Sequence, residues 1–358
     1  MQQQQQQQQK QHHLEQRESS SQLLTDPSQM DYVHHIAFDV YGRRVATSAG
    51  DRYVRVWDLA ADGTWFLSSK WQAHQQGAVG QLAWSHPEFG TLLATCAGPE
   101  VRIWEEKKTR HPQQSQQAVV WISKTQQLND ARKAVTCLGF APRHLGLQLA
   151  AGSADGVCRV YEAVDLMNVS QWPLQGAFGG GGEGVTCLSW CTGRFEPATI
   201  VLGGHGFLSV WRYSSHQKAW QAYLQLDSAG QGGPPPHMLD VAWAPNVGRR
   251  FHLVAAAQSG GPLKVYRLSR HLPGSPGTEE KDGEWPDVDV KSYDLASSEQ
   301  IWRCQWNVTG TVLAGSGDGG LVRLWKCNNG GEWRCVSEIY GDLSATQPPT
   351  AAATAMKM

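Results

Sequence analysis

The chain has 358 residues, of which 41% are hydrophobic, and a formal net charge of -1, so it lacks the basic surplus that bulk binding of nucleic acid or anionic membrane requires. No apolar run approaches the roughly 18 residues of a membrane-spanning helix, and the glutamine-rich start does not predict a signal peptide. The 8 cysteines contain no C-x-x-C pair, which favours reduced core residues of an intracellular protein over disulfides or metal ligands.

The first segment of the chain is predicted to be a tail. Residues 2–9 are all glutamine, and charged and serine-rich sequence follows them. Such a composition cannot bury enough apolar surface to offset the entropy of ordering. We therefore expect residues 1–29 to be a disordered Gln-rich tail that folding does not need. The alternative is a short coiled coil or a helix that forms on a partner.

From Val33 onward, a unit of three predicted strands recurs six times. Its clearest copy, residues 301–326, reads IWRCQWNVTGTVLAGSGDGGLVRLWK, and its Asn/Gly and Asp/Gly turns predict an antiparallel meander. One aromatic residue ends the first strand and another ends the third strand, 19 to 23 residues later. The pairs are Phe38 and Trp57, Trp84 and Trp104, Phe140 and Tyr161, Trp190 and Trp211, Trp243 and Tyr266, and Trp306 and Trp325.

The remaining length of each repeat predicts a fourth strand. The candidates are residues 65–70, 119–128, 171–176, 219–226, 288–293 and 333–340. Six four-stranded units that each end their third strand in an aromatic residue are typical of an all-β, six-bladed WD40 β-propeller. We place the propeller at residues 30–342, between the tail of residues 1–29 and a second disordered tail at residues 343–358.

Motifs that could carry chemistry are better explained by the fold. Asp51, Asp155 and Asp318 stand in turns, where a carboxylate accepts hydrogen bonds from backbone amides. The glycines at 315, 317 and 320 fit a dinucleotide-binding fingerprint, but a strand follows them instead of the helix that the fingerprint requires. His74 precedes a first strand, where WD repeats often place a histidine that bonds across the blade. Neither the histidine spacing nor any nucleophile and base pattern predicts a metal site, a cofactor or catalysis.

Several stretches resemble the Seh-type nucleoporins. They are GRRVATSAGDRYVRVWD from Gly42, AWSHPEFGTLLATC from Ala83, FAPRHLGLQLAAGSADGVCRVYEAVDLMNVSQWPLQ from Phe140, AWAPNVGRRFHLVAAA from Ala242 and QWNVTGTVLAGSGDGGLVRLWK from Gln305. The resemblance covers all six units. The glutamine-rich start, residues 179–182 and the Pro/Gly-rich insert at residues 273–286 depart from the family's pattern.

The resemblance implies a non-catalytic scaffold at the nuclear pore. Seh-type propellers belong to the Y-shaped scaffold that supports nucleocytoplasmic transport of protein and mRNA, and to the SEA/GATOR nutrient-signalling complex. It also implies a location at the nuclear envelope, and possible additional locations are the cytoplasm and the lysosomal or vacuolar surface. The implied partners are other Y-complex nucleoporins and SEA/GATOR subunits, with no direct nucleic acid and no membrane insertion.

The strand count predicts an open ring. The last unit holds its own fourth strand, and only a poor strand candidate precedes Val33, so blades one and six would meet at an unlatched seam. The resemblance implies that a helical scaffold nucleoporin donates a blade in trans to cover such a seam. We expect its contacts to be Val33, Ile36, Phe38, Trp333, Val336, Ile339 and Tyr340.

Two other functions stay open from the sequence. HPEFG and the Trp-rich strands are shared with the sister propeller of the COPII outer coat, which would place the chain at vesicles. A free-standing WD40 adaptor that recognises a peptide on the top face of the propeller is the second alternative.

Overall fold

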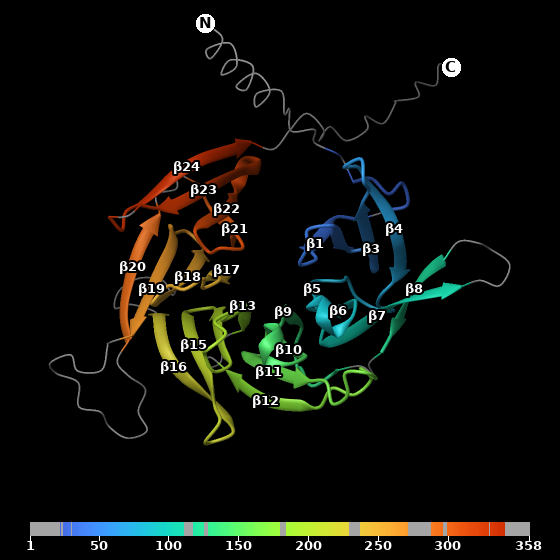
Figure 1. Cartoon of the computed structure of the whole chain (residues 1–358), viewed down its shortest axis with the longest axis horizontal. Helices are drawn as coiled ribbons and strands as arrows, with labels where there is room; N and C mark the ends of the chain where they lie inside the picture. The colour runs from blue at the N-terminus through green and yellow to red at the C-terminus, as the bar shows by residue number, and fades with distance from the viewer. Residues whose placement is uncertain are drawn as a thin grey trace, which may run out of the picture.

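Six antiparallel, four-stranded sheets follow one another round a ring in chain order (Figure 1). The computed structural model describes residues 22, 24–29, 31–110, 117–124, 128–179, 184–228, 237–270, 288–295, 299–328 and 330–340. Within each sheet the strands keep their sequence order, with the first strand toward the centre of the ring and the fourth at its rim. The expected all-β, six-bladed propeller is confirmed.

The strands of the first three blades have these bounds. Blade one comprises β1 (Val33–Phe38), β2 (Arg44–Ala49), β3 (Tyr53–Leu59) and β4 (Trp65–Gln72). Blade two comprises β5 (Leu82–Trp84), β6 (Leu92–Ala97), β7 (Glu100–Arg110) and β8 (Gln117–Ser123). Blade three comprises β9 (Val135–Phe140), β10 (Gln148–Ser153), β11 (Val157–Glu162) and β12 (Leu174–Gly179).

The strands of the other three blades follow the same plan. Blade four comprises β13 (Val185–Trp190), β14 (Thr199–Gly204), β15 (Phe207–Ser214) and β16 (Ala219–Ser228). Blade five comprises β17 (Met238–Trp243), β18 (Phe251–Gln258), β19 (Leu263–Arg270) and β20 (Val288–Leu295). Blade six comprises β21 (Ile301–Trp306), β22 (Val312–Gly317), β23 (Leu321–Cys327) and β24 (Trp333–Tyr340).

The aromatic residues expected to end the first strands do end β1, β5, β9, β13, β17 and β21. All six fourth strands exist. The last has its predicted bounds, β4, β16 and β20 each run two residues further than predicted, and β8 and β12 are shifted. β8 stops at Ser123, and Leu128 pairs instead with Val101 as an isolated bridge. β12 starts at Leu174 because Pro173 has no N–H to donate to a ladder. Short 3-10 turns lie at η1 (Pro87–Phe89), η2 (Arg143–Leu145) and η3 (Asp318–Gly320). No helix in the described ranges is long and apolar enough to cross a membrane.

Two of the three predicted turn aspartates act as expected. Asp155 accepts the backbone N–H of Val157 at 3.0 Å, and Asp51 accepts that of Tyr53 at 3.1 Å. Asp318 differs, because its carboxylate accepts the indole N–H of Trp302 at 2.7 Å. Trp302 is half exposed, so this contact holds an aromatic ring at the surface of blade six.

His74 has the structural role expected of it. Its Nε2 lies 2.8 Å from the Thr95 hydroxyl, which also accepts the indole N–H of Trp104 at 3.1 Å. Its Nδ1 lies 3.6 Å from the carboxylate of Glu100. Thr95 lies in β6, and Glu100 and Trp104 lie in β7, so His74 ties the chain that enters blade two to the second and third strands of that blade.

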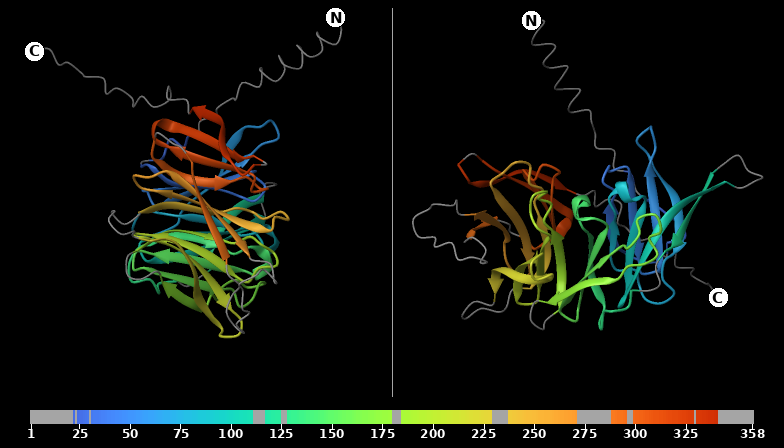
Figure 2. Two further views of the ribbon diagram at one scale, coloured as in Figure 1. Left: turned by 90° about the vertical axis from the view of Figure 1, so that its left-hand side faces the viewer. Right: turned by 60° about the horizontal axis from the view of Figure 1, so that its bottom comes forward.

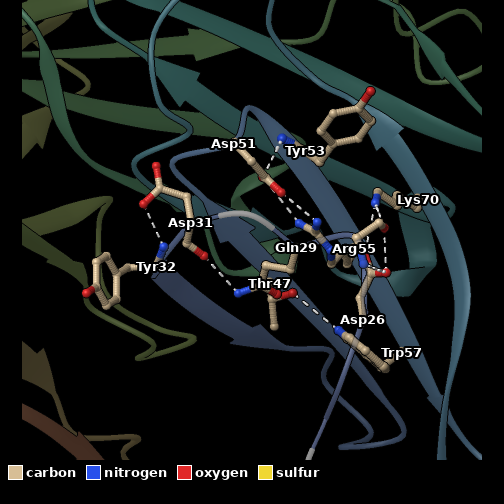
Figure 3. A network of polar contacts seen from close by, with 11 residues as sticks. Asp26, Gln29, Asp31, Tyr32, Thr47, Asp51, Tyr53, Arg55, Trp57 and Lys70 are labelled. Atoms are coloured by element: carbon tan, nitrogen blue, oxygen red, sulfur yellow. Dashed lines mark hydrogen bonds and ion pairs between the residues drawn. The ribbon is translucent and has the colours of Figure 1, made fainter. Parts of the chain in front are cut away.

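Asp26 does the same for blade one, from inside the segment expected to be a tail. Its carboxylate accepts the Arg55 Nε–H at 2.6 Å and the Lys70 ammonium at 2.9 Å, while Asp51 holds the other end of Arg55 at 2.6 Å (Figure 3). The side chain of Arg55 is 1% exposed. Gln22 also bonds the backbone of Trp65 through both ends of its amide. Gln22, Asp26 and Ser28 therefore contribute contacts to blade one. Residues 1–21 and 343–358 lie outside the described residues, and the tail boundaries there stay predictions.

The hydrophobic core is divided among the junctions between blades. Five clusters of buried residues fill the junctions one–two, two–three, three–four, four–five and five–six. Seen edge-on, the sheets are stacked face against face (Figure 2). Each sheet in such a stack needs a neighbour on both sides to bury its two apolar faces. Among the described residues, no sixth cluster joins blade six to blade one.

We expect Asp26→Ala to lower the free energy of unfolding by about 2 kcal/mol at pH 7, because Arg55 loses one of two buried acidic partners. Burial would raise the pKa of Asp26, but hydrogen bonds from Ser28, Arg55 and Lys70 outweigh it and hold the pKa well below its usual value. A carboxylate whose pKa is lower in the folded than in the unfolded state stabilises the folded protein at pH values above its unfolded pKa. This stabilisation is lost as the pH falls from the unfolded pKa toward the folded one. The deficit of the variant should therefore shrink below about pH 4.

Urea denaturation of wild type and variant at pH 7 and pH 3.5 measures this effect. Asp289→Ala, which removes an exposed carboxylate 3.7 Å from Lys291, is the matched control and should change little. Deleting residues 1–21 should be neutral, whereas deleting residues 1–29 should cost as much as Asp26→Ala or more. Equal stability of the two deletions would show that the Asp26 contact does not stabilise the fold.

We expect Thr95→Val to destabilise the propeller by about 1–3 kcal/mol, since it leaves the buried Trp104 indole N–H and His74 Nε2 without their shared partner. The replacement keeps the shape of the side chain, so lost packing contributes little. Thermal and urea denaturation check the effect, with Thr309→Val in an exposed loop as the control. A stability equal to that of wild type would contradict the bonding role of the hydroxyl.

Candidate functional site

The candidate site is the open junction between blade six and blade one. The first strands of successive blades pack in order, β1 on β5, β5 on β9, β9 on β13, β13 on β17 and β17 on β21. No comparable packing of β21 on β1 occurs in the described ranges. Figure 1 shows the ring interrupted there, between β1 and the red sheet of β21 to β24. We call this junction the seam.

Blade six is buried on one face only. In β6 and β14, which are second strands of complete junctions, every residue is buried. In β22 and β23 of blade six, buried residues instead alternate with partly exposed ones. Side chains of successive residues in a strand point to opposite faces, so this alternation means that one whole face has no covering sheet.

The strand register identifies the uncovered face of blade six. Residues directly opposite each other in neighbouring strands share a face. Cross-strand pairs therefore give two rows on that face, one of Gln305, Ala314, Leu324 and Ser337 and one of Arg303, Ser316, Val322 and Ile339. All eight are partly or fully exposed, whereas Trp306, Leu313 and Trp325 on the opposite face are buried against blade five.

The matching face of blade one is covered in part by its own chain. Val33, Ile36 and Phe38 are 42%, 55% and 60% exposed. Farther out on the same face, Arg55 is fully buried, and Asp26 of the N-terminal segment lies on it (Figure 3). Blade one therefore presents an exposed apolar first strand beside a polar contact that is already satisfied.

Hydrogen bonds between blades show what the seam lacks. The indole N–H groups of three first-strand tryptophans donate to a carbonyl of the preceding first strand: Trp84 to Ala37 at 3.0 Å, Trp190 to Gly139 at 2.9 Å and Trp306 to Ala242 at 3.0 Å. Blade one has Phe38 at this position, which carries no N–H to donate. A direct closure of blade one onto blade six would therefore lack this bond.

A second set of bonds runs in the other direction round the ring. The Thr136 hydroxyl donates to the Val185 carbonyl at 2.6 Å, and the Thr186 hydroxyl donates to the Met238 carbonyl at 2.6 Å. The corresponding residue of blade six, Trp302, has no following blade to bond and is half exposed. Among the described residues, the seam thus has neither kind of bond, whereas at least one kind occurs at four of the five filled junctions.

Arg303 places a cation at the inner end of the seam, beside His35 and Asp240. Burial first, and the charge of Arg303 second, lower the pKa of His35 to about 4. His35 is thus neutral at physiological pH, and its Nδ1 accepts the N–H of Leu82 at 3.4 Å. Arg303 also lies 3.8 Å from the partly buried carboxylate of Asp240. Desolvation raises the pKa of Asp240, which accepts the N–H of Cys304 at 2.9 Å.

The seam residues selected from sequence divide into two groups. Val33, Ile36, Phe38 and Ile339 lie on the two seam faces, and Val336 is exposed at a bulge of β24. Trp333 instead packs edge-on against Trp306, with ring centroids 5.7 Å apart, and so faces blade five. Tyr340 pairs with Leu321 on that same face, although it is 71% exposed. Binding of a partner by any of these residues stays a prediction.

Sequence reasoning missed Arg303, Gln305, Val322 and Leu324. The signal that would have found them is the strand period of two, counted from the buried Leu313 and Trp325 across the register. Within the described residues, no three His, Cys, Asp or Glu side chains gather in a way that would hold a metal ion.

Comparisons with known proteins agree with this architecture. The WD40 family profile, "WD domain, G-beta repeat", matches residues 21–58 and 290–326, and its first match begins upstream of Asp26. A chain of the solved structure "Crystal Structure of Mitotic Checkpoint Complex" superposes with a TM-score of 0.58 at 15% identity, covering 85% of this chain and 77% of that one. At that identity the likeness supports the fold alone.

Whole-length relatives are more specific. The chain is 36% identical to "Nucleoporin SEH1" of Danio rerio over 340 residues, which cover 91% of this chain and 90% of the relative. It is 36% identical to "Nucleoporin SEH1" of Homo sapiens over 327 residues, which cover 88% and 87%. With "Nucleoporin SEH1-A" of Xenopus laevis, 36% identity extends over 323 residues, or 87% and 86%. Because the similarity runs through all six blades, the chain belongs to the SEH1 nucleoporin family.

Proposed function

We propose that this protein is a non-catalytic scaffold nucleoporin whose open seam receives a blade donated in trans by a helical scaffold partner. The observation that carries the proposal is the one-sided burial of blade six, where β22 and β23 leave Val322, Leu324 and their neighbours without a covering sheet. A sheet inserted there would bury apolar surface on both of its faces. It would also supply the inter-blade bonds that Phe38 and Trp302 do not make.

The chemistry of the seam favours a permanent partner. Strands that pack against two blade faces would bury more than about 1,600 Å², the size typical of a stable interface. Exposed strand edges with apolar faces are a liability that proteins usually cover, so a long-lived complex is a better solution than a transient one. The inserted sheet would contact Ile36 and Phe38 on one side and Val322 and Ile339 on the other.

The family supports the location and the assembly. The relatives are named nucleoporins, so we propose that the chain sits in the Y-shaped subcomplex of the nuclear pore at the nuclear envelope and supports nucleocytoplasmic transport. We extend the proposal to SEA/GATOR in the cytoplasm or at the lysosomal or vacuolar surface, where the same seam would receive a different subunit. The names of the relatives also favour a structural role over an enzymatic one.

Hydrogen exchange tests the seam directly. Amides of β1 and β24 should exchange more slowly after the N-terminal segment of the helical scaffold partner is added, because new strands cover the seam faces. Amides of β14, deep in the ring, should not change. Equal exchange of β1 and β24 with and without the segment would overturn insertion at the seam.

A charge placed on the seam should block binding without unfolding the ring. We expect Ile339→Asp to abolish copurification of the helical partner, because an unpaired carboxylate would be buried in the complex. Ile339 is 52% exposed on an outer strand, so thermal stability of the isolated chain should remain unchanged. Val120→Asp, on the outer strand of blade two, is the matched control and should retain the partner. Normal copurification by Ile339→Asp would place the partner elsewhere.

A further inference from the structure

Three loops at one end of the ring carry exposed apolar tips. These loops join the first and second strands of blades four, five and six, and their tips are Phe195, Val247 and Val308. The three side chains are 96%, 70% and 86% exposed. Because the strands are antiparallel, this end of the ring is opposite the end that bears the turn aspartates Asp51, Asp155 and Asp318. The patch is therefore distinct from the top face that a peptide-reading propeller would use.

Polar contacts between neighbouring blades hold these loops together. Arg249 of blade five donates through one terminal nitrogen to the Gly310 carbonyl of blade six and through the other to the Pro245 carbonyl, each at 2.6 Å. His252 of blade five lies 3.4 Å from the Glu196 carboxylate of blade four. These contacts connect the three loops to one another, and such cross-links favour a preorganised surface.

The same loops have an excess of positive charge. Residues 192–198, 245–250 and 307–311 contain Arg194, Arg249 and Arg250 as cations and Glu196 as their single acid. Glu196 is engaged by His252 and by Arg212, 3.6 Å away. Arg249 donates to carbonyls rather than to an acid at both terminal nitrogens. Burial and the charge of Arg194 together lower the pKa of His144 on the adjacent loop of blade three, so the positive field extends beyond the three loops.

We propose that this loop-tip patch, made of Phe195, Val247 and Val308 with Arg194 and Arg250, docks an acidic amphipathic helix of another subunit. The exposed apolar tips would be buried by an apolar stripe on the partner. A helix with apolar residues three or four positions apart presents such a stripe. The single acid of these loops is already engaged, so their arginines favour a partner helix that carries carboxylates beside its apolar stripe. Phe195 and Val247 are on blades four and five, away from the seam, so a helix centred on them and a blade in the seam would bind different parts of the propeller.

An anionic membrane is the other surface that apolar and basic groups fit, and the patch suits it less well. Stable attachment to lipid usually needs a cluster of about 4–8 basic residues or a second membrane signal. Only two exposed arginines, Arg194 and Arg250, stand beside the three tips within these loops. Two of the tips are valines, whose small side chains would bury little apolar surface in a bilayer. The test below separates the two surfaces.

Photo-crosslinking in cells identifies what covers the patch. The full-length tagged chain carries p-benzoylphenylalanine in place of Val247, and the crosslinked peptide is sequenced by mass spectrometry after irradiation. We expect one segment rich in Asp and Glu, with apolar residues three or four apart. Phe195→Ala and Arg194→Glu should each reduce its yield about tenfold, as loss of a central contact does.

Matched variants keep the result interpretable. Val120→Ala and Lys291→Glu alter exposed residues on outer strands and should leave the yield unchanged. Phe195 is almost fully exposed, so Phe195→Ala should melt like wild type. Ile339→Asp should lower binding at the seam while crosslinking at Val247 persists. The proposal would be overturned by a crosslink to lipid, to a second copy or to a neutral or basic segment. It would also be overturned by the absence of any crosslink, or by a yield that Phe195→Ala and Arg194→Glu do not change.

Discussion

Burial of both faces of every sheet is the constraint on which this propeller depends. A blade has apolar residues on its two sides, and a neighbouring blade must cover each side. Five junctions satisfy this requirement with continuous hydrophobic clusters. At the ends of the series the requirement fails, and the alternating burial of β22 and β23 is the direct consequence. The candidate site therefore arises where the repeated packing of blade on blade ends, between blade six and blade one.

The two faces of the seam differ in how much of each face the chain itself covers. Blade one carries its own N-terminal segment, and Asp26 contributes to a buried ion-pair network with Arg55 and Lys70. Blade six has no equivalent cover over Val322 or Leu324 among the described residues. A partner sheet would consequently meet interspersed apolar and polar side chains on blade six, and on blade one an apolar first strand beside an ion-pair network that is already satisfied. That asymmetry gives an inserted sheet one preferred orientation.

Much of the fold could be read from local sequence because its signals are local. The paired aromatic residues fixed which strand is first and which is third, and Gly and Asn marked the turns between them. The face on which a residue lies was harder, since it depends on register. Trp333 is apolar and is the first residue of β24, yet only its contact with Trp306 shows that it faces blade five. Asp26 was missed because its partner Arg55 is 29 residues away and no local pattern predicts such an ion pair.

The proposed insertion would make folding and assembly parts of one process. The isolated chain buries the cores of its five junctions, and the apolar residues at the seam are in contact with water. With a partner sheet in the seam, the stabilisation that a closed propeller obtains from its last junction would come from the complex. The subunit would then be held in place by the same kind of packing that holds its blades together. Its loops are left available for further contacts, because none of the loop-tip residues is needed to close the ring.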